Sequence, residues 1–190
     1  MTTRGIRNNN PLNIRRSDSN PWRGRAARQT DRRFAQFTAR EWGYRAAFCL
    51  MRTYMERRGA NTLGKIVTRW APPSDGNDTQ AYIDFVSRTT GIAADRPLRF
   101  ADQAAMVGIV RSMAQMESGV VEDGRLLDRA YCMALTGGGL RGAAGPWGSV
   151  SLPRPRPWGE RNIYLDTTTK KIGIFVLCLV ILFTTPAGRR

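Results

Sequence analysis

The sequence predicts a mainly α fold with a single helical domain. Apolar side chains recur at three- and four-residue steps in five segments between residues 40 and 135, which is the period of an amphipathic helix. Capping residues, glycine and proline bound most of these segments. The length of 190 residues is enough for one ordinary core with a tail to spare. We therefore expect a helical domain over residues 1–136, followed by two further segments.

The first predicted helix follows Thr38, because Thr38 and Glu41 have the spacing of a capping box. Gly59 is a natural C-terminal stop for this helix. Its inward stripe is Tyr44, Ala47, Phe48, Met51, Tyr54 and Met55, which leaves Arg45, Arg52, Glu56 and Arg57 pointing outward. A second, shorter stripe of Leu63, Ile66, Val67 and Trp70 must end at Pro72 and Pro73, because proline cannot donate the next backbone hydrogen bond.

Three more helices complete the predicted domain. The third begins at Asp78 or Thr79 and fades over residues 89–91, the fourth covers about 102–117, and the fifth covers about 123–135. The inward residues expected of them are Tyr82, Phe85 and Val86, then Met106, Ile109, Val110 and Met113, then Leu127, Ala130, Tyr131 and Ala134. Residues 5–33 hold eight arginines without an apolar period and predict an irregular basic loop region, after which Phe34 and Phe37 are the first core anchors.

The chain beyond the domain changes character twice. Residues 137–168 are rich in Gly, Pro and Arg without a period, which indicates a linker. Residues 169–190 contain an apolar run from Ile172 to Phe183. Its 12 residues would span about 18 Å as a helix, against roughly 30 Å of hydrocarbon. Extending the run to residue 187 still leaves it short, so a membrane-inserted tail and a buried segment are both open.

Composition limits the chemistry and the partners. The formal charge is +15 and 27 of the 30 basic residues are arginine, which indicates an anionic polymer or surface: peptidoglycan, teichoic acid, nucleic acid or anionic lipid. The absence of histidine removes Ser-His and Cys-His catalytic pairs and the commonest metal ligand, so we predict no metal and no cofactor. Cys49, Cys132 and Cys178 have apolar neighbours and are expected to be buried free thiols. Residues 1–4 lead into polar sequence, which predicts no secretion signal.

An asparagine-rich motif, GIRNNNPLNIR over residues 5–15, is the most distinctive feature of the chain. It is followed by RWAPP at residues 69–73 and NDTQAYI at residues 77–83. Together these motifs resemble a family of small phage and prophage virion structural proteins. The Asn-Pro-x-Asn-Ile part of the motif is similar to a loop of lysozyme-like peptidoglycan hydrolases. The resemblance covers about residues 4–135 and implies a lysozyme-like α domain, a place in the virion and other virion proteins as partners.

Glu117 is the first candidate for catalysis. It lies four residues after Met113 and seven after Val110, so it falls on the apolar stripe of its own helix near the C-terminal end. Burial and the negative end of the helix dipole both favour a protonated carboxyl, as a general acid requires. Glu-Ser-Gly at a helix end also resembles the catalytic motif of lytic transglycosylases, although those enzymes place the glutamate before the corresponding Asn loop. The alternative is a helix-terminal glutamate that pairs with an arginine or reaches solvent.

Other polar residues have two interpretations each. Glu41 is a second candidate acid, but a capping box explains it without catalysis. Asn8, Asn9, Asn10 and Asn13 offer amides suited to N-acetyl groups and sugar hydroxyls, with Trp22 and Tyr44 as stacking surfaces. Equally, the same amides could hold an irregular segment onto the domain. Trp70 is interpreted as a core residue, with Arg69 pairing an acid.

Three functions compete on this sequence. The first is a virion-associated protein of the virion or the cell envelope that engages peptidoglycan and cleaves its glycan strands during entry or release, by hydrolysis or lytic transglycosylation. The second is a non-enzymatic structural virion protein, favoured by the absence of a glutamate before the Asn motif. The third is a nucleic-acid-binding accessory protein, for which helix-turn-helix, zinc and aromatic-strand signatures are missing.

Overall fold

The structure is a computed structural model that describes residues 2–17 and 19–137. These residues are mainly helical, which confirms the predicted fold class. The elements are α1 (Arg4–Arg7), α2 (Arg40–Arg58), α3 (Leu63–Trp70), the 3₁₀ turn η1 (Pro73–Asp75), α4 (Thr79–Thr90), α5 (Gln103–Ser118) and α6 (Gly124–Leu135). Apart from Gly137, the predicted linker and apolar tail, including Cys178, lie outside the described residues and stay predictions.

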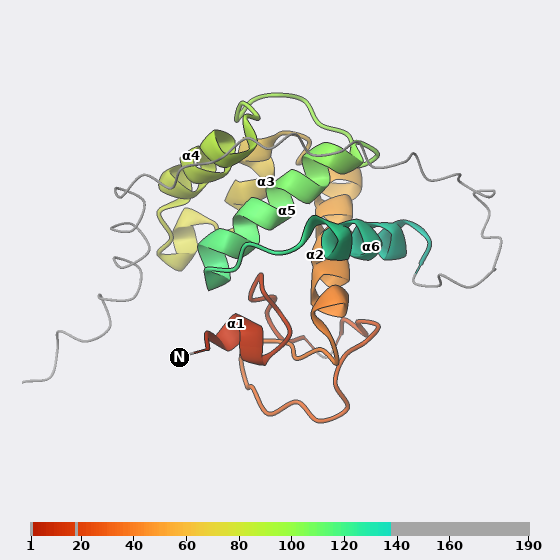
Figure 1. Ribbon diagram of the computed structural model, residues 1–190. Coiled ribbons are helices and arrows are strands. Elements are labelled where there is room, and N and C mark those ends of the chain that lie inside the picture. The colour runs from red at the N-terminus through yellow and green to blue at the C-terminus, as the bar shows by residue number, and fades with distance from the viewer. Residues whose placement is uncertain (1, 18, 138–190) are drawn as a thin grey trace, which may run out of the picture. The chain divides into compact units, whose positions relative to one another are not determined.

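Helix α5 is the centre of the packing. It contacts α1, α2, α4 and α6, and Figure 1 shows it in green between the α3–α4 pair and the α2–α6 pair. The four inward residues predicted for it, Met106, Ile109, Val110 and Met113, are fully buried. Continuing the same stripe for one turn leads to Glu117, so the packing of α5 fixes where this carboxylate lies.

Three helices begin with the aspartate side chains that the sequence indicates. Asp78 accepts a hydrogen bond from the backbone amide of Ala81 at 3.0 Å, and Asp102 and Asp123 act in the same way at α5 and α6. These bonds satisfy amides that lack a partner within the helix. Gly59, in the left-handed region with φ of 64°, ends α2 as predicted.

The predicted capping box at the start of α2 is wrong. The N-cap of α2 is Ala39, without a side-chain bond. The Thr38 hydroxyl instead donates to the backbone oxygen of Gly24, and Glu41 accepts from Arg129 at 2.8 Å. Tertiary partners therefore compete successfully with the local cap. The outward orientation expected of Arg45 is also wrong, because this residue is buried at 8% exposure.

The N-terminal region is irregular, as expected, apart from α1 and two isolated β-bridges that pair Arg15 with Phe34 and Arg25 with Phe37. Phe37 is a core residue, while Phe34 is only half-buried. The region reaches α5 through Gly5 of α1, where a Cβ would lie 2.3 Å from the Ser118 hydroxyl oxygen. Glycine is needed here because of the close approach of α1 to the end of α5.

The described part of the chain contains two of the three thiols. Both are free, as the sequence predicts, but only Cys132 is buried, while Cys49 is half-buried. Among the described helices, none combines the length and the apolar character needed to cross a membrane.

Candidate active site

Glu117 lies in the last turn of α5, where three segments distant in sequence reach its carboxylate. The side-chain amide of Asn13 donates to Oε2 at 3.1 Å. The Trp70 indole and the Tyr82 hydroxyl both donate to Oε1, each at 3.3 Å. The N-terminal motif, the end of α3 and the first turn of α4 thus meet at one carboxylate.

The electrostatics of Glu117 are those of a half-buried acid without a counter-ion. Its contacts are with neutral donors, and the described residues give it no ion pair, so the arginine pairing considered from sequence is not found there. Burial raises the pKa of Glu117 above its usual value, and the hydrogen bonds from Asn13, Trp70 and Tyr82 oppose this rise. The net effect favours a carboxyl that keeps its proton to higher pH.

Tyr82 is suited to stay a neutral donor. Burial and the neighbouring Glu117 carboxylate both raise the pKa of its hydroxyl well above the usual range. The hydroxyl therefore stays protonated wherever Glu117 titrates. The indole of Trp70 has a donor and no acceptor, so Trp70 can only donate a hydrogen bond to Glu117.

The asparagines of the N-terminal motif divide into two groups. Asn10 is fully buried and donates to the backbone oxygens of Ile14 and Ala35, while its own oxygen accepts from the Ile14 amide. Asn8 and Asn9 also use their amides within the protein, on Asp31 and on the Phe37 carbonyl. These three asparagines therefore hold the irregular N-terminal segment onto the domain, which is the structural interpretation of the motif.

Asn13 forms the second group. Its φ of 49° lies in the left-handed region, which asparagine tolerates better than most residues. This backbone conformation accompanies a side chain that reaches across to α5, where the amide also lies 3.4 Å from the Glu117 backbone oxygen. Of the four asparagines proposed from sequence, Asn13 is the one that the structure brings to Glu117.

The remaining sequence candidates lie elsewhere. Glu41 is in the first turn of α2 and forms an ion pair with Arg129 of α6 at 2.7 Å. Tyr44 has no exposed surface and cannot offer its ring to a sugar. Trp22 is half-buried against the core, with its indole nitrogen buried. These three residues therefore have structural surroundings distinct from those of Glu117.

Two residues of the site were not identified as site residues from sequence. Trp70 and Tyr82 fall on apolar stripes and were assigned to the core, which accounts for their rings but not for their polar tips. Both tips point to Glu117. A buried Trp or Tyr usually finds a hydrogen-bond partner, so their places in the RWAPP and NDTQAYI motifs were the available signal.

The described residues contain a buried carboxylate outside the candidate site, but no metal cluster. Glu122 is 6% exposed and forms an ion pair with Arg40 at 3.0 Å, which accounts for its charge. Within residues 2–17 and 19–137, no three acidic or thiol side chains gather as metal ligands would.

Comparison with known proteins shows that the chain belongs to a family of phage proteins. It is similar to Protein P5 of Pseudoalteromonas phage PM2, with 36% identity over 118 residues. The aligned region covers 61% of this chain and 71% of the relative. The chain matches no family model.

Proposed function

We propose that the protein is associated with the phage virion, engages peptidoglycan and cleaves its glycan strands, with Glu117 as the general acid. The observation that carries this proposal is the set of contacts at Glu117: a part-buried carboxyl on α5, held by neutral donors from three separate segments. Such an arrangement orients the carboxyl and leaves its proton available. Membership in a phage protein family supports the virion part of the proposal.

The chemistry begins with proton transfer from Glu117 to the oxygen of a glycosidic bond. As the bond between the anomeric carbon and this oxygen breaks, the leaving sugar takes the proton as a hydroxyl group. The described contacts of Glu117 include no second carboxylate, which a two-acid hydrolase would need. A hydroxyl of the substrate sugar can itself attack the anomeric carbon and return its proton to Glu117. This route gives an anhydro sugar, regenerates the acid and consumes no water.

Asn13 is a positioning residue in this scheme. Its amide holds Oε2, the oxygen that Trp70 and Tyr82 leave free. Because the side-chain amide has a donor end and an acceptor end, a turn of the amide allows it to receive the proton of a neutral Glu117. The same residue can therefore orient the carboxyl in both protonation states.

The test is clearance of purified peptidoglycan sacculi by the wild-type protein and two variants. Glu117→Gln keeps an acceptor for Trp70 and Tyr82 but cannot give up a proton, so it should bind the sacculi and not clear them. Glu41→Gln removes an acid of the same type from the ion pair with Arg129 and should clear them normally. Equal clearance by wild type and Glu117→Gln would overturn the assignment of the acid.

A non-enzymatic structural virion protein is the second candidate, and one observation favours it. The side-chain amides of Asn8, Asn9 and Asn10 donate hydrogen bonds to other residues of the domain, so much of the N-terminal motif has a structural role. This candidate predicts that the protein co-purifies with particles and that Glu117→Gln leaves particle assembly and infection unchanged. The enzyme instead predicts normal assembly with impaired entry or release.

We propose a virion or cell-envelope location, with the apolar run at residues 172–187 as the membrane-attaching segment. The sequence supports this through the apolar composition of the run, although the run is shorter than a helix that spans the hydrocarbon. Deleting residues 168–190 should release the protein from membranes. Continued membrane association of the deleted chain would contradict the proposal.

A further inference from the structure

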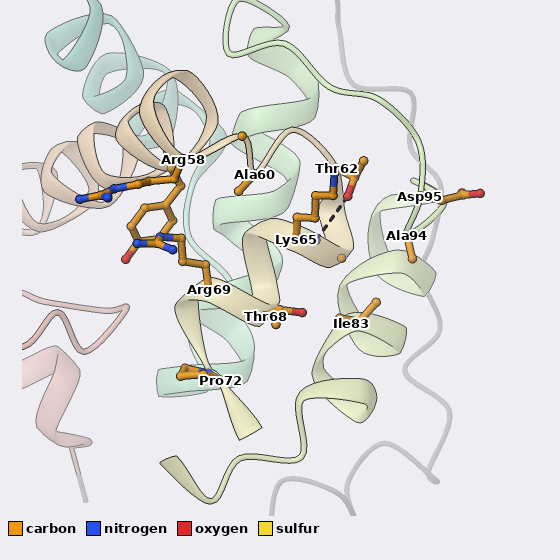
Figure 2. Close-up of a pocket in the computed structure, with 13 residues that line it drawn as sticks. Arg58, Ala60, Thr62, Lys65, Thr68, Arg69, Pro72, Ile83, Ala94 and Asp95 are labelled. Carbon is orange, nitrogen blue, oxygen red and sulfur yellow. Dashed lines mark hydrogen bonds between the residues drawn. The ribbon is translucent and has the colours of Figure 1, made fainter. Parts of the chain in front are cut away.

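A basic groove lies beside the Glu117 site, between the end of α2, helix α3 and the segment before α5. It has a volume of about 990 Å³, which is within the range of sites for small ligands and short peptides. Figure 2 shows its lining, which includes Arg58 of α2, Lys65 and Arg69 of α3, and Asp95. Three cations and one carboxylate leave this lining with a net positive charge.

The cations of the groove are arranged on rigid elements. Lys65 and Arg69 are four residues apart on α3 and therefore share one face of the helix. The Arg69 guanidinium lies over the ring of Tyr54, 5.3 Å from its centroid, which restricts its position. Arg58 lies in the last turn of α2, next to Gly59.

These cations lack carboxylate partners within the part of the chain that the structure describes. Ion pairs there involve other arginines, and none includes Arg58, Lys65 or Arg69. Three like charges in a lining with a single carboxylate, Asp95, which forms an ion pair with none of them, repel one another in the isolated protein, and an anion that binds there relieves this repulsion. The groove is therefore complementary to a negatively charged ligand.

The groove also adjoins the candidate acid. Tyr54, which lines it, packs edge-on against Trp70 with the ring centroids 6.4 Å apart. Trp70 in turn donates to Glu117. Arg69 and Pro72, on either side of Trp70 in sequence, line the groove as well. Trp70 thus lies between a residue of the groove lining and Glu117.

We propose that this groove binds carboxylate-bearing peptide, namely the stem peptides attached to peptidoglycan glycan strands. The inference rests on the proposed function, and it names the part of the substrate that the protein uses for recognition. Ala60, Ile83 and Ala94 add small apolar surfaces to the lining, which suit aliphatic peptide side chains. Single-stranded nucleic acid fits less well, because it calls for aromatic platforms and the ring of Tyr54 is covered by Arg69.

The experiment measures binding of a soluble stem peptide to the full-length protein by isothermal titration calorimetry. Arg58→Gln combined with Lys65→Gln removes two charges from the groove. The matched control is Arg57→Gln combined with Arg88→Gln, because both arginines are exposed, lie in the last turn of a helix and do not line the groove. We expect the groove variant to weaken binding by roughly five- to thirtyfold and the control by less than twofold.

Two ligand controls decide which chemistry the groove recognises. The same peptide with its carboxylates amidated should bind the wild type as weakly as the intact peptide binds the groove variant. A short oligonucleotide should lose no more affinity in the groove variant than in the control variant. Equal binding of the amidated peptide, or equal loss in both protein variants, would overturn the proposal, and a groove-specific loss confined to the oligonucleotide would replace it with a nucleic-acid site.

A cleavage assay separates this inference from the proposed function. The groove variant should cleave glycan strands that carry stem peptides more slowly than wild type, and peptide-free strands at the wild-type rate. If wild type cleaves neither substrate, the proposed function fails while the titration still decides the peptide site. If the groove variant cleaves both substrates at the wild-type rate, the groove assignment fails while the role of Glu117 stands.

Discussion

Replacing Gly5 by alanine tests how the N-terminal motif is joined to the candidate site. An alanine Cβ at this position would lie 2.3 Å from the Ser118 hydroxyl oxygen, 3.0 Å from the Asn10 backbone oxygen and 3.2 Å from the Asn13 side-chain oxygen. Distances this short force the neighbours to move. The substitution therefore presses on the end of α5 and on the side chain that holds Glu117.

The change in unfolding free energy caused by Gly5→Ala combines two opposing effects. Overpacking of a well-packed site costs about 1–3 kcal/mol, and any gain in helix propensity is small because α1 has only four residues. Ser118→Ala removes the hydroxyl that meets the new methyl group, but it also leaves the buried Pro11 carbonyl without the donor that lies 2.6 Å away. That loss costs about 1–2 kcal/mol.

A double-mutant cycle measured by urea denaturation of the full-length chain separates these effects. Gly5→Ala with Ser118→Ala should be less destabilised than the sum of the single variants by about 1–2 kcal/mol, because the hydroxyl that clashes is already gone. Gly108→Ala serves as the control, since its Cβ would meet nothing closer than 3.7 Å. Within α5 this change should stabilise the protein by about 0.5–1 kcal/mol.

Two results would contradict close packing of Gly5 on the end of α5. Strict additivity of the two substitutions would mean that Gly5 and Ser118 do not meet as described. A Gly5→Ala variant as stable as Gly108→Ala would mean that α1 does not pack closely on α5. Either result would mean that the N-terminal motif does not contact the end of α5, next to Glu117, in the way described.

Three further predictions concern the acids. Burial raises the pKa of Glu117 above its ordinary value of 4.5. The unfolding free energy of wild type relative to Glu117→Gln should therefore be greatest below pH 4.5 and fall as pH rises through the pKa of Glu117 in the folded protein. Urea titrations between pH 4 and 8 that show this difference growing with pH would contradict the prediction. Asn13→Gly keeps the left-handed backbone accessible while removing a donor that lowers the pKa of Glu117, so the alkaline limb of the pH-rate profile should move to higher pH, and an unchanged limb would remove Asn13 from the site. Glu41→Gln breaks an exposed ion pair with Arg129 and should lower the unfolding free energy by less than about 1 kcal/mol, as measured by denaturation, with a loss well above this value arguing against a surface pair.

Much of the helical frame could be predicted from the sequence, because its signals are local. The stripe of Met106, Ile109, Val110 and Met113 specifies the buried face of α5, and aspartate before α4, α5 and α6 specifies where those helices begin. Glycine and proline mark the ends of α2 and α3 in the same local way.

The exceptions depend on contacts between distant residues. Thr38 and Glu41 have the spacing of a capping box, yet their partners are Gly24 and Arg129. Helix α1 has no apolar period of its own, and its single turn is held by the close approach of Gly5 to α5. Neither feature can be read from a local pattern.

The candidate site was partly predictable for a similar reason. Glu117 could be identified because a carboxylate is unusual on the apolar stripe of a helix. Asn13 could be proposed as part of a polar motif but not separated from Asn8, Asn9 and Asn10, since the difference lies in which side chain faces α5. Trp70 was missed because the sequence does not show which way an indole N–H points in a packed core.

Analysis of the soluble products shows whether Glu117 is the acid that cleaves glycan strands. Purified peptidoglycan would be incubated with the full-length protein and with Glu117→Gln, both shown to be folded by circular dichroism, and the released muropeptides identified by mass spectrometry. We expect products ending in anhydro-muramyl groups with the wild type and none with the variant. Absence of any glycan-derived product from the folded wild-type protein, or the same products from both proteins, would contradict this expectation.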